Sequence, residues 1–272
     1  MKLRTVSCFI LFISFLILHS CSPNNVTIDN SLQKYFDSNH VTGTFALFDN
    51  GSGQFTVYNL PRYKDSAFLP ASTFKIVNSL IGLQIGKITN EKMIIKWDGV
   101  KRWNEAWNKD LTMEEAFKLS AVPYYQEVAR RIGKDTMQFW LDSLHYGNKK
   151  IGGAIDSFWL NNSLKVTADE QLGLVKRLYF DQLPFDKRTQ SIVKKIMLQE
   201  NNANYSLSYK TGFGYKEDGK SLAWIVGWVE ENKHPYFFAL NIEGAHDADL
   251  VNMRMTILKG ILKQLDFLQG KR

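Results

Sequence analysis

Ser72 and Lys75 lie three residues apart in the segment PASTFK (70–75), which leads into an almost wholly apolar run. On a helix, side chains at this spacing share one face and can reach each other. A serine hydroxyl is a weak nucleophile unless a neighbouring base takes its proton. Burial in the apolar helix predicted over residues 76–85 would lower the pKa of the lysine and make it such a base. A serine and a lysine at this spacing also occur by chance in ordinary helices, where the lysine extends to the surface. The neighbouring motifs must therefore decide between a reactive pair and an ordinary helix.

Further short motifs follow this pair in order along the chain. They are SAV (120–122), YGN (146–148), which ends a helical stretch, and KTG (210–212), which lies in an alternating, strand-like segment. S-x-x-K, S-D-N and K-T-G together are typical of class A β-lactamases and penicillin-binding proteins, but here SAV stands in the place of S-D-N. With YGN, FWL (158–160) and the STFK form of the first motif, the chain resembles the class D serine β-lactamases, the oxacillinase group, from about Thr42 to Leu265.

This resemblance implies a role for each matching residue in opening a β-lactam ring. Ser72 would attack the strained carbonyl and form an acyl-enzyme, with the backbone N–H groups of Ser72 and Phe213 as the oxyanion hole. Lys75 would react with carbon dioxide to give a carbamate (N6-carboxylysine) that serves as general base for both halves of the reaction. Ser120, helped by Lys210, would pass a proton to the departing ring nitrogen. The resemblance implies no cofactor apart from this carbon dioxide on Lys75.

Two further residues would surround the carbamate. The resemblance implies that Trp159 donates its indole N–H to the carbamate and that Val122 keeps the pocket apolar. Core packing remains the alternative for Trp159, which lies between Phe158 and Leu160. Packing at a helix end remains the alternative for Val122.

The KTG strand and the terminal helix would bind the substrate. Lys210 and Thr211 would face the substrate carboxylate, while Gly212 would let a substrate amide approach the strand closely. Arg254 is the candidate carboxylate clamp, because a planar guanidinium matches a carboxylate; a solvated helix arginine is the alternative. Tyr146 and Asn148 are expected to shape the wall of the site.

The pattern of elements predicts an α/β fold of the α+β type. An antiparallel sheet built from both chain termini would be flanked by helices and interrupted by a mostly helical lobe at roughly residues 66–202, within one penicillin-binding/transpeptidase-like domain over residues 22–272. Asn50 to Gly53 predict a hairpin turn. Capping boxes begin at Thr112 and Thr167. The expected strands and terminal helix are Thr42–Phe48, Gln54–Asn59, Ser206–Phe213, Leu222–Glu230, Tyr236–Glu243 and about Leu250 to Leu268.

The N-terminus predicts export. Lys2 and Arg4 precede an apolar run over residues 8–18 that is shorter than a usual membrane span, so residues 1–21 are expected to be a signal peptide. The segment LHSC, which ends at Cys21, resembles a bacterial lipoprotein cleavage site, although His19 is not the usual residue there. We therefore expect a periplasmic protein or a lipoprotein anchored to the membrane through Cys21, with ordinary signal cleavage nearby as the alternative.

Composition argues against several other classes of protein. The cysteines are Cys8 and Cys21 only, so a domain without the signal peptide has no internal disulfide. The five histidines form no H-E-x-x-H or other compact pair, which disfavours a zinc hydrolase, and no metal site is expected. The net charge is +7, but the basic residues are scattered and no nucleic-acid motif occurs. Trp103 and Trp107, four residues apart, are expected to pack in the core or between lobes. The sequence leaves the oligomeric state open.

Four alternatives to a β-lactamase compete. A penicillin-binding transpeptidase or carboxypeptidase shares the S-x-x-K and K-T-G motifs, but it carries S-x-N where this chain has SAV. A β-lactam sensor acylates without turnover, and such sensors resemble class D enzymes but carry several membrane spans before the binding domain. A general S-x-x-K esterase or a structural periplasmic protein leaves the ordered motifs unexplained. Small-molecule β-lactams are therefore the expected substrates.

Overall fold

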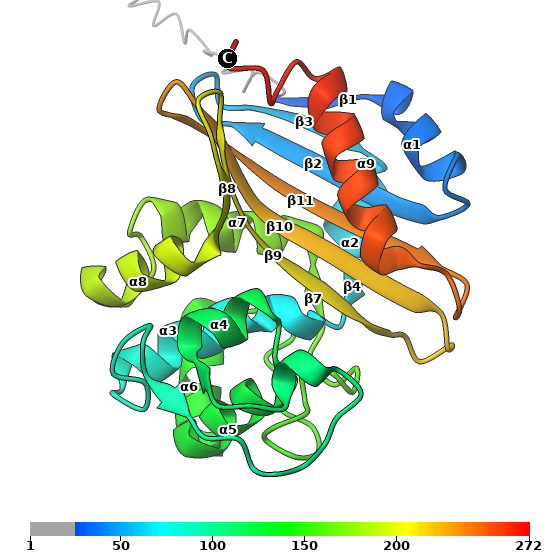
Figure 1. Cartoon of the computed structure of the whole chain (residues 1–272). Coiled ribbons are helices and arrows are strands. Elements are labelled where there is room, and N and C mark those ends of the chain that lie inside the picture. The colour runs from blue at the N-terminus through cyan, green and yellow to red at the C-terminus, as the bar shows by residue number, and fades with distance from the viewer. Residues whose placement is uncertain (1–24) are drawn as a thin grey trace, which may run out of the picture.

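A seven-stranded sheet forms the centre of the molecule. The structure, a computed structural model, describes residues 25–272, so the expected signal peptide and Cys21 lie outside the described residues. The strand order across the sheet is β1-β3-β2-β11-β10-β9-β8, which joins the two ends of the chain as expected (Figure 1). In chain order the strands are β1 (Val26–Ile28), β2 (Thr42–Asp49), β3 (Gln54–Tyr58), β8 (Leu198–Asn201), β9 (Ser206–Tyr215), β10 (Ser221–Glu231) and β11 (His234–Gly244).

The hairpin between β2 and β3 forms where the turn residues predict it. Asp49 pairs with Gln54, and the Asp49 carboxylate accepts the Gly51 N–H at 2.8 Å. Gly53 adopts a φ of +70°, a conformation that costs glycine little. The expected antiparallel pairing holds from β3 to β8, whereas the edge strand β1, which the sequence did not predict, pairs with β3 in parallel.

Helices cover both faces of the sheet, which therefore borders two hydrophobic cores. Side chains alternate along β10: Ala223 and Ile225 belong to the core under α9 (Leu250–Gln264) and α1 (Gln33–Asp37), whereas Trp224 and Val226 belong to the core on the opposite face. On that opposite face lie α7 (Ala168–Tyr179) and the rest of the helical lobe (Figure 1). The terminal helix ends at Gln264, four residues earlier than expected.

The inserted region is mostly helical, as the sequence predicts. Both expected capping boxes are present: Thr112 accepts the Glu115 N–H, and Thr167 accepts the Glu170 N–H. Two short strand pairs, β4 with β7 and β5 with β6, brace the region. Among the described residues no helix is long and apolar enough to cross a membrane. The helices from α2 to α8 are Leu60–Asp65, Lys75–Gln84, Met113–Lys118, Val122–Ile132, Lys134–Leu144, Ala168–Tyr179 and Lys187–Met197, the short strands β4 to β7 are Ala67–Phe68, Ile94–Ile95, Leu111–Thr112 and Val166–Thr167, and the 3-10 turns η1 to η3 are Asn30–Leu32, Ala71–Phe74 and Glu105–Trp107.

Candidate active site

Ser72 and Lys75 meet at the junction of a 3-10 turn and a buried helix. Ser72 lies in η2, and Lys75 is the first residue of α3, nearly all of which is buried. The Lys75 Nζ lies 2.8 Å from the Ser72 Oγ, within hydrogen-bonding distance. Ser72 is 8% exposed and Lys75 only 1% exposed. The hydroxyl can therefore be reached from the cavity described below, while the amine behind it is shielded from water.

Burial sets the protonation of Lys75. Desolvation disfavours the ammonium form and lowers its pKa from 10.5 to about 7. The Lys75 Nζ lies 5.4 Å from the centre of the Tyr125 ring, and no carboxylate forms an ion pair with it in the described part of the chain. A large fraction of Lys75 is thus neutral near pH 7, as a base or a nucleophilic amine must be.

The turn that carries Ser72 is strained and firmly held. Ala71 has a φ of +48°, which is unfavourable for a residue with a Cβ. Its N–H donates to the carbonyl of Trp159 at 3.1 Å, and the backbone N–H of Thr73 donates to the carbonyl of Pro70 at 3.1 Å. Pro70 therefore precedes a 3-10 turn, and the helix predicted over residues 76–85 begins at Lys75 as α3. Strain of this kind persists only where the surroundings enforce it.

A buried polar chain behind the turn was not predicted from the sequence. Gln171 on α7 donates through Nε2 to the Thr73 Oγ1 at 2.6 Å, and the Thr73 hydroxyl donates to the Pro70 carbonyl at 2.7 Å. Gln171 also accepts the Tyr146 hydroxyl at 3.4 Å. Because burial raises the pKa of Tyr146, its hydroxyl stays protonated. Neither Tyr146 nor Asn148 lines the catalytic cavity; Tyr146 packs on Phe74 behind it.

Ser120 and Lys210 form a second reactive pair on another side of the cavity. The SAV turn joins α4 to α5, and Ser120 has a φ of +55° in this turn. The Lys210 Nζ donates to the Ser120 Oγ at 3.0 Å and to the Thr211 carbonyl at 3.0 Å. Desolvation, and then the charges of Lys75 and Arg254, lower the pKa of Lys210 well below its usual value. Ser120 thus has a proton donor and acceptor with a perturbed pKa as its direct partner.

Trp159 is fully buried, yet its indole N–H has no hydrogen-bond partner. The ring stacks on Phe74, the residue before Lys75, with centroids 5.4 Å apart and planes 25° apart. A buried donor without an acceptor is costly and needs an explanation, such as a catalytic role. Val122, at the start of α5, lines the cavity as expected. The indole therefore offers a hydrogen bond that nothing in the described chain accepts.

The KTG strand forms another wall and comes very close to the nucleophile turn. A Cβ on Gly212 would lie 2.9 Å from the Pro70 carbonyl oxygen, so only glycine fits between β9 and η2. Arg254 reaches over from α9 and donates to the Gly212 carbonyl at 2.5 Å. Burial lowers the pKa of this guanidinium to about 10, and it remains cationic at neutral pH. Thr211 and Phe213 line the cavity beside it.

The cavity in which these residues meet has a volume of about 620 Å³ and an aromatic rim. Trp103 is 85% exposed and lines this cavity together with Trp107. The expectation that Trp103 packs in the core is therefore wrong. Leu119, Leu160 and Val251 add apolar surface. The sequence did offer a sign of this rim. Trp103 and Trp107 lie in a polar segment that lacks the apolar periodicity of a buried helix, which is typical of exposed tryptophans.

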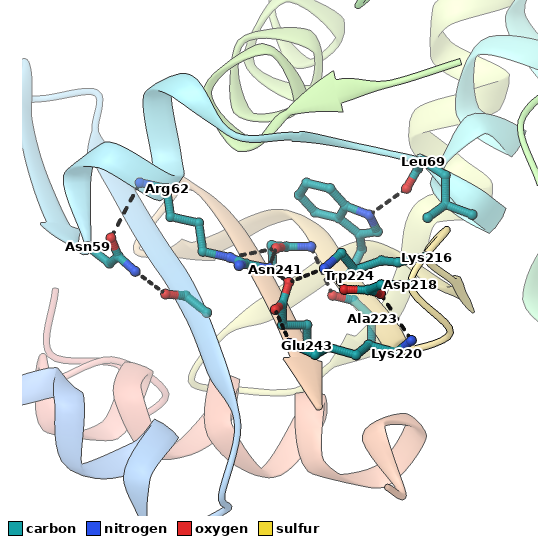
Figure 2. A network of polar contacts seen from close by, with 11 residues as sticks. Asn59, Arg62, Leu69, Lys216, Asp218, Lys220, Ala223, Trp224, Asn241 and Glu243 are labelled. Atoms are coloured by element: carbon teal, nitrogen blue, oxygen red, sulfur yellow. Dashed lines mark hydrogen bonds and ion pairs between the residues drawn. The ribbon is translucent and has the colours of Figure 1, made fainter. Parts of the chain in front are cut away.

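A polar network attaches the segment before Ser72 to the sheet. Figure 2 shows Arg62 of α2 reaching Asn241 and Glu243 of β11, at 2.6 and 3.0 Å, and Trp224 donating its indole N–H to the Leu69 carbonyl at 2.9 Å. Burial would raise the pKa of Glu243, but Arg62 and Lys216 lower it below its usual value. This network fixes both ends of the short segment that leads into the nucleophile turn.

Known proteins resemble the chain over most of its length. The family model described as the penicillin binding protein transpeptidase domain matches residues 36–263. Beta-lactamase OXA-48 of Klebsiella pneumoniae is 40% identical over 236 residues, which cover 87% of this chain and 88% of that protein. FUS-1 (OXA-85), a class D beta-lactamase from Fusobacterium nucleatum subsp. polymorphum, superposes with a TM-score of 0.85 at 35% identity, covering 89% of this chain and all of that one. The C-terminal domain of the Bacillus licheniformis BlaR penicillin-receptor superposes with a TM-score of 0.84 at 30% identity, covering 89% and 97%.

Proposed function

The chain belongs to the class D β-lactamases, within the penicillin-binding transpeptidase superfamily, and we propose that it hydrolyses the β-lactam ring through an acyl-enzyme on Ser72. Such an activity confers resistance to β-lactam antibiotics. The observation that carries the mechanism is the 2.8 Å contact between the Ser72 Oγ and a Lys75 amine whose pKa burial lowers to about 7. A nucleophile in contact with a base of matched pKa is what acyl transfer requires at neutral pH.

In the acylation half, the carboxylated form of Lys75 takes the proton as the Ser72 Oγ attacks the lactam carbonyl. The backbone N–H groups of Ser72 and Phe213, both of which line the cavity, are proposed to bind the developing oxyanion. Ser120 then gives its proton to the ring nitrogen as the C–N bond breaks. Lys210, 3.0 Å from the Ser120 Oγ, returns a proton to that oxygen.

The substrate carboxylate is proposed to bind beside the KTG strand. Arg254 and Lys210 lie close enough for the charge of one to lower the pKa of the other, so this side of the cavity concentrates positive charge. An anion bound there relieves that repulsion and pairs with a guanidinium already held by the Gly212 carbonyl. Thr211 supplies a hydroxyl at the same edge.

Lys75 is proposed to work in a carboxylated form. The site suits this modification, because the amine is buried and the unpartnered indole N–H of Trp159 can donate to a carboxyl group on it. Val122 lines the neighbouring wall and brings no competing polar group. When carboxylated, Lys75 supplies an anionic general base for water attack on the ester of Ser72. Trp159 orients that base, and the apolar surroundings disfavour the nitrogen protonation that would release carbon dioxide.

Steady-state hydrolysis of a chromogenic cephalosporin and of benzylpenicillin tests this proposal. Many turnovers per site are expected. A second candidate function, a β-lactam sensor that is acylated and not regenerated, is favoured by the likeness to the penicillin-receptor domain. The sensor would open one β-lactam ring per site, stay acylated and then stop.

The place of the protein in the cell is also a proposal. We infer export to the periplasm, with anchoring through a lipid on Cys21, from the N-terminal pattern alone. Labelling of cells with a radioactive fatty acid should mark the protein and should fail with Cys21→Ser. An unlabelled protein processed to a similar size would indicate ordinary signal cleavage.

A further inference from the structure

A second cavity lies apart from the nucleophile, between the segment 96–110 and helix α5. Its volume is about 390 Å³, within the range of small-molecule sites. Three aromatic side chains line it, from Trp97, Trp107 and Tyr124, with Ile95 and Leu111 beside them. Of the site residues predicted from the sequence, none lines this cavity.

The segment that forms one wall is held in shape by its own contacts. Arg102 pairs with the Asp98 carboxylate through two hydrogen bonds, of 2.8 and 2.6 Å. Asn108 both accepts the Arg102 N–H at 2.9 Å and donates to the Arg102 carbonyl at 3.0 Å. The Asp110 carboxylate accepts the Trp97 N–H at 2.9 Å. The cavity is therefore formed before any ligand arrives, which lowers the entropic cost of binding.

The lining of this cavity carries unbalanced positive charge. Five cationic and two anionic side chains face it, a formal charge of +3, although the same residues are scattered in the sequence; they are Lys96, Arg102, Lys109, Arg130, Arg131, Asp98 and Glu127. The acids are already engaged, since Asp98 pairs with Arg102 and Glu127 pairs with both Arg130 and Arg131.

Two of the cations are left for a ligand. The side chains of Lys96 and Lys109 form no hydrogen bond or ion pair within residues 25–272. The charge of Lys109 lowers the pKa of Glu115 without direct contact. Arg130 has a further partner in Asp156, at 2.6 Å. An anion entering the cavity would thus meet two free ammonium groups at the ends of the segment.

We propose that this cavity binds a small planar aromatic carboxylate. The ring would pack among Trp97, Trp107 and Tyr124, and the carboxylate would pair with Lys96 and Lys109. The Tyr124 hydroxyl is already bonded to the Met93 carbonyl at 3.1 Å and the residue is only 3% exposed, so Tyr124 closes one side of the cavity and offers the ligand no polar group.

The second cavity shares a wall with the catalytic one. Trp107 lines both cavities, and its indole N–H donates at 3.1 Å to the carbonyl of Leu119, the residue before Ser120. At the start of α5, Val122 faces the catalytic cavity and Pro123 the second one. A ligand that shifts Trp107 would therefore change catalysis without competing with substrate.

Calorimetric titration of the purified protein with biphenyl-4-carboxylate tests the site, and it does not depend on any hydrolytic activity. Lys96→Glu combined with Lys109→Glu should raise the dissociation constant by about tenfold or more, because attraction becomes repulsion. The matched control is Lys87→Glu with Lys187→Glu, two exposed lysines of equal charge away from both cavities, which should change it by less than about twofold.

Arg254→Ala separates the two cavities. It removes a cation from the catalytic cavity only, so binding of biphenyl-4-carboxylate should persist. Loss of binding in Arg254→Ala, an unchanged constant in the Lys96/Lys109 variant, or no heat at millimolar ligand would each overturn the proposal. In a hydrolysis assay the ligand should change both kcat and KM, and saturating substrate should not displace it. Purely competitive inhibition would contradict the proposal that the ligand acts through Trp107 from outside the catalytic cavity.

Discussion

The two sides of the catalytic cavity are built in opposite ways. The nucleophile side is buried: Lys75 is 1% exposed, and the turn of Ser72 is held from distant parts of the chain by Trp159 and by Gln171, which donates to Thr73. The facing side is the segment 96–110, which is held by hydrogen bonds between its own residues, such as Arg102 and Asn108. Trp103 in this segment is 85% exposed. Substitutions on the buried side should thus alter reaction rates, whereas those on the segment should alter the choice of ligand.

The largest effect is expected for Ser72→Ala. Removal of the nucleophile should lower kcat by about 10⁴-fold or more, as in other serine hydrolases. The change is small and the site is a cavity wall, so the fold should persist, which circular dichroism can check. Peptide mapping after brief exposure to penicillin should place the adduct on the Ser72 peptide of the wild type. Adduct formation at the normal rate in Ser72→Ala would remove Ser72 from its assigned role.

Trp159→Phe should have a smaller effect than removal of the nucleophile. Phenylalanine can keep the stacking on Phe74 but lacks the unpartnered N–H. Deacylation should slow by about 10²-fold, within the usual range for general-base assistance, and more than acylation does. Acyl-enzyme should accumulate in intact-mass spectra. Equal slowing of both steps would mean that the indole acts only through packing.

The pH dependence follows from Lys75. Its pKa is about 7 in the folded protein and 10.5 without burial, so between these values the unfolded chain binds more protons. The free energy of unfolding therefore rises with pH between about 7 and 10.5. Below pH 7 Lys75 is protonated in both states, and the full destabilisation from burying its charge is present. Lys75→Met should stabilise the protein at pH 7 and abolish turnover.

Activity at low pH provides the second readout for Lys75. kcat/KM of the wild type should fall by about tenfold per pH unit below 7 in degassed buffer, as the amine becomes protonated. Bicarbonate should restore part of the activity, and carbon-13 bicarbonate should give a carbamate signal that Lys75→Met lacks. A flat profile between pH 5 and 7 would contradict the assignment of Lys75 as base.

Thr73→Val should have an intermediate effect. It keeps the shape of the side chain but leaves the buried Gln171 amide without its acceptor at 2.6 Å, a loss of about 1–3 kcal/mol in unfolding free energy. kcat should fall by about tenfold because the Ser72 turn loosens. Thr73→Ser, which retains the hydroxyl, should recover most of kcat. Failure of serine to recover it would assign the effect to packing.

The smallest effect is expected on the exposed side. Trp103→Ala removes ring surface from the cavity rim, so KM should rise by about threefold to tenfold for penicillins with bulky aromatic side chains. kcat and the thermal midpoint should stay close to wild type, because Trp103 is 85% exposed. A large fall in kcat would mean that the segment positions the reacting groups.

What the sequence predicts well is local. Ser72 and Lys75 are neighbours on one turn, and the strands of the KTG region alternate clearly, so their approach follows from short-range geometry. The sheet built from both ends of the chain, with a helical region between, is confirmed. Arg254 was harder to place: the terminal helix could be predicted, but the contact with the Gly212 carbonyl depends on how α9 packs across the sheet.

What the sequence does not predict depends on tertiary contacts. Gln171 is 98 residues from Thr73, and no short motif links them. Trp103 and Trp107 have helical spacing but lie in a segment that is mostly irregular, so the periodicity argument placed Trp103 inside when it is outside. The strain at Ala71 is likewise invisible in a sequence where alanine predicts ordinary helix.

Rapid-quench mass spectrometry of the protein mixed with a hundredfold excess of benzylpenicillin tests the central claim most directly. The account predicts that a Ser72 adduct forms, that it stays a small fraction of the protein, and that it disappears once all the penicillin has been hydrolysed. A stoichiometric adduct on Ser72 that persists for hours, with one equivalent of penicillin consumed and no hydrolysed product released, would contradict it and would establish a penicillin sensor or transpeptidase instead.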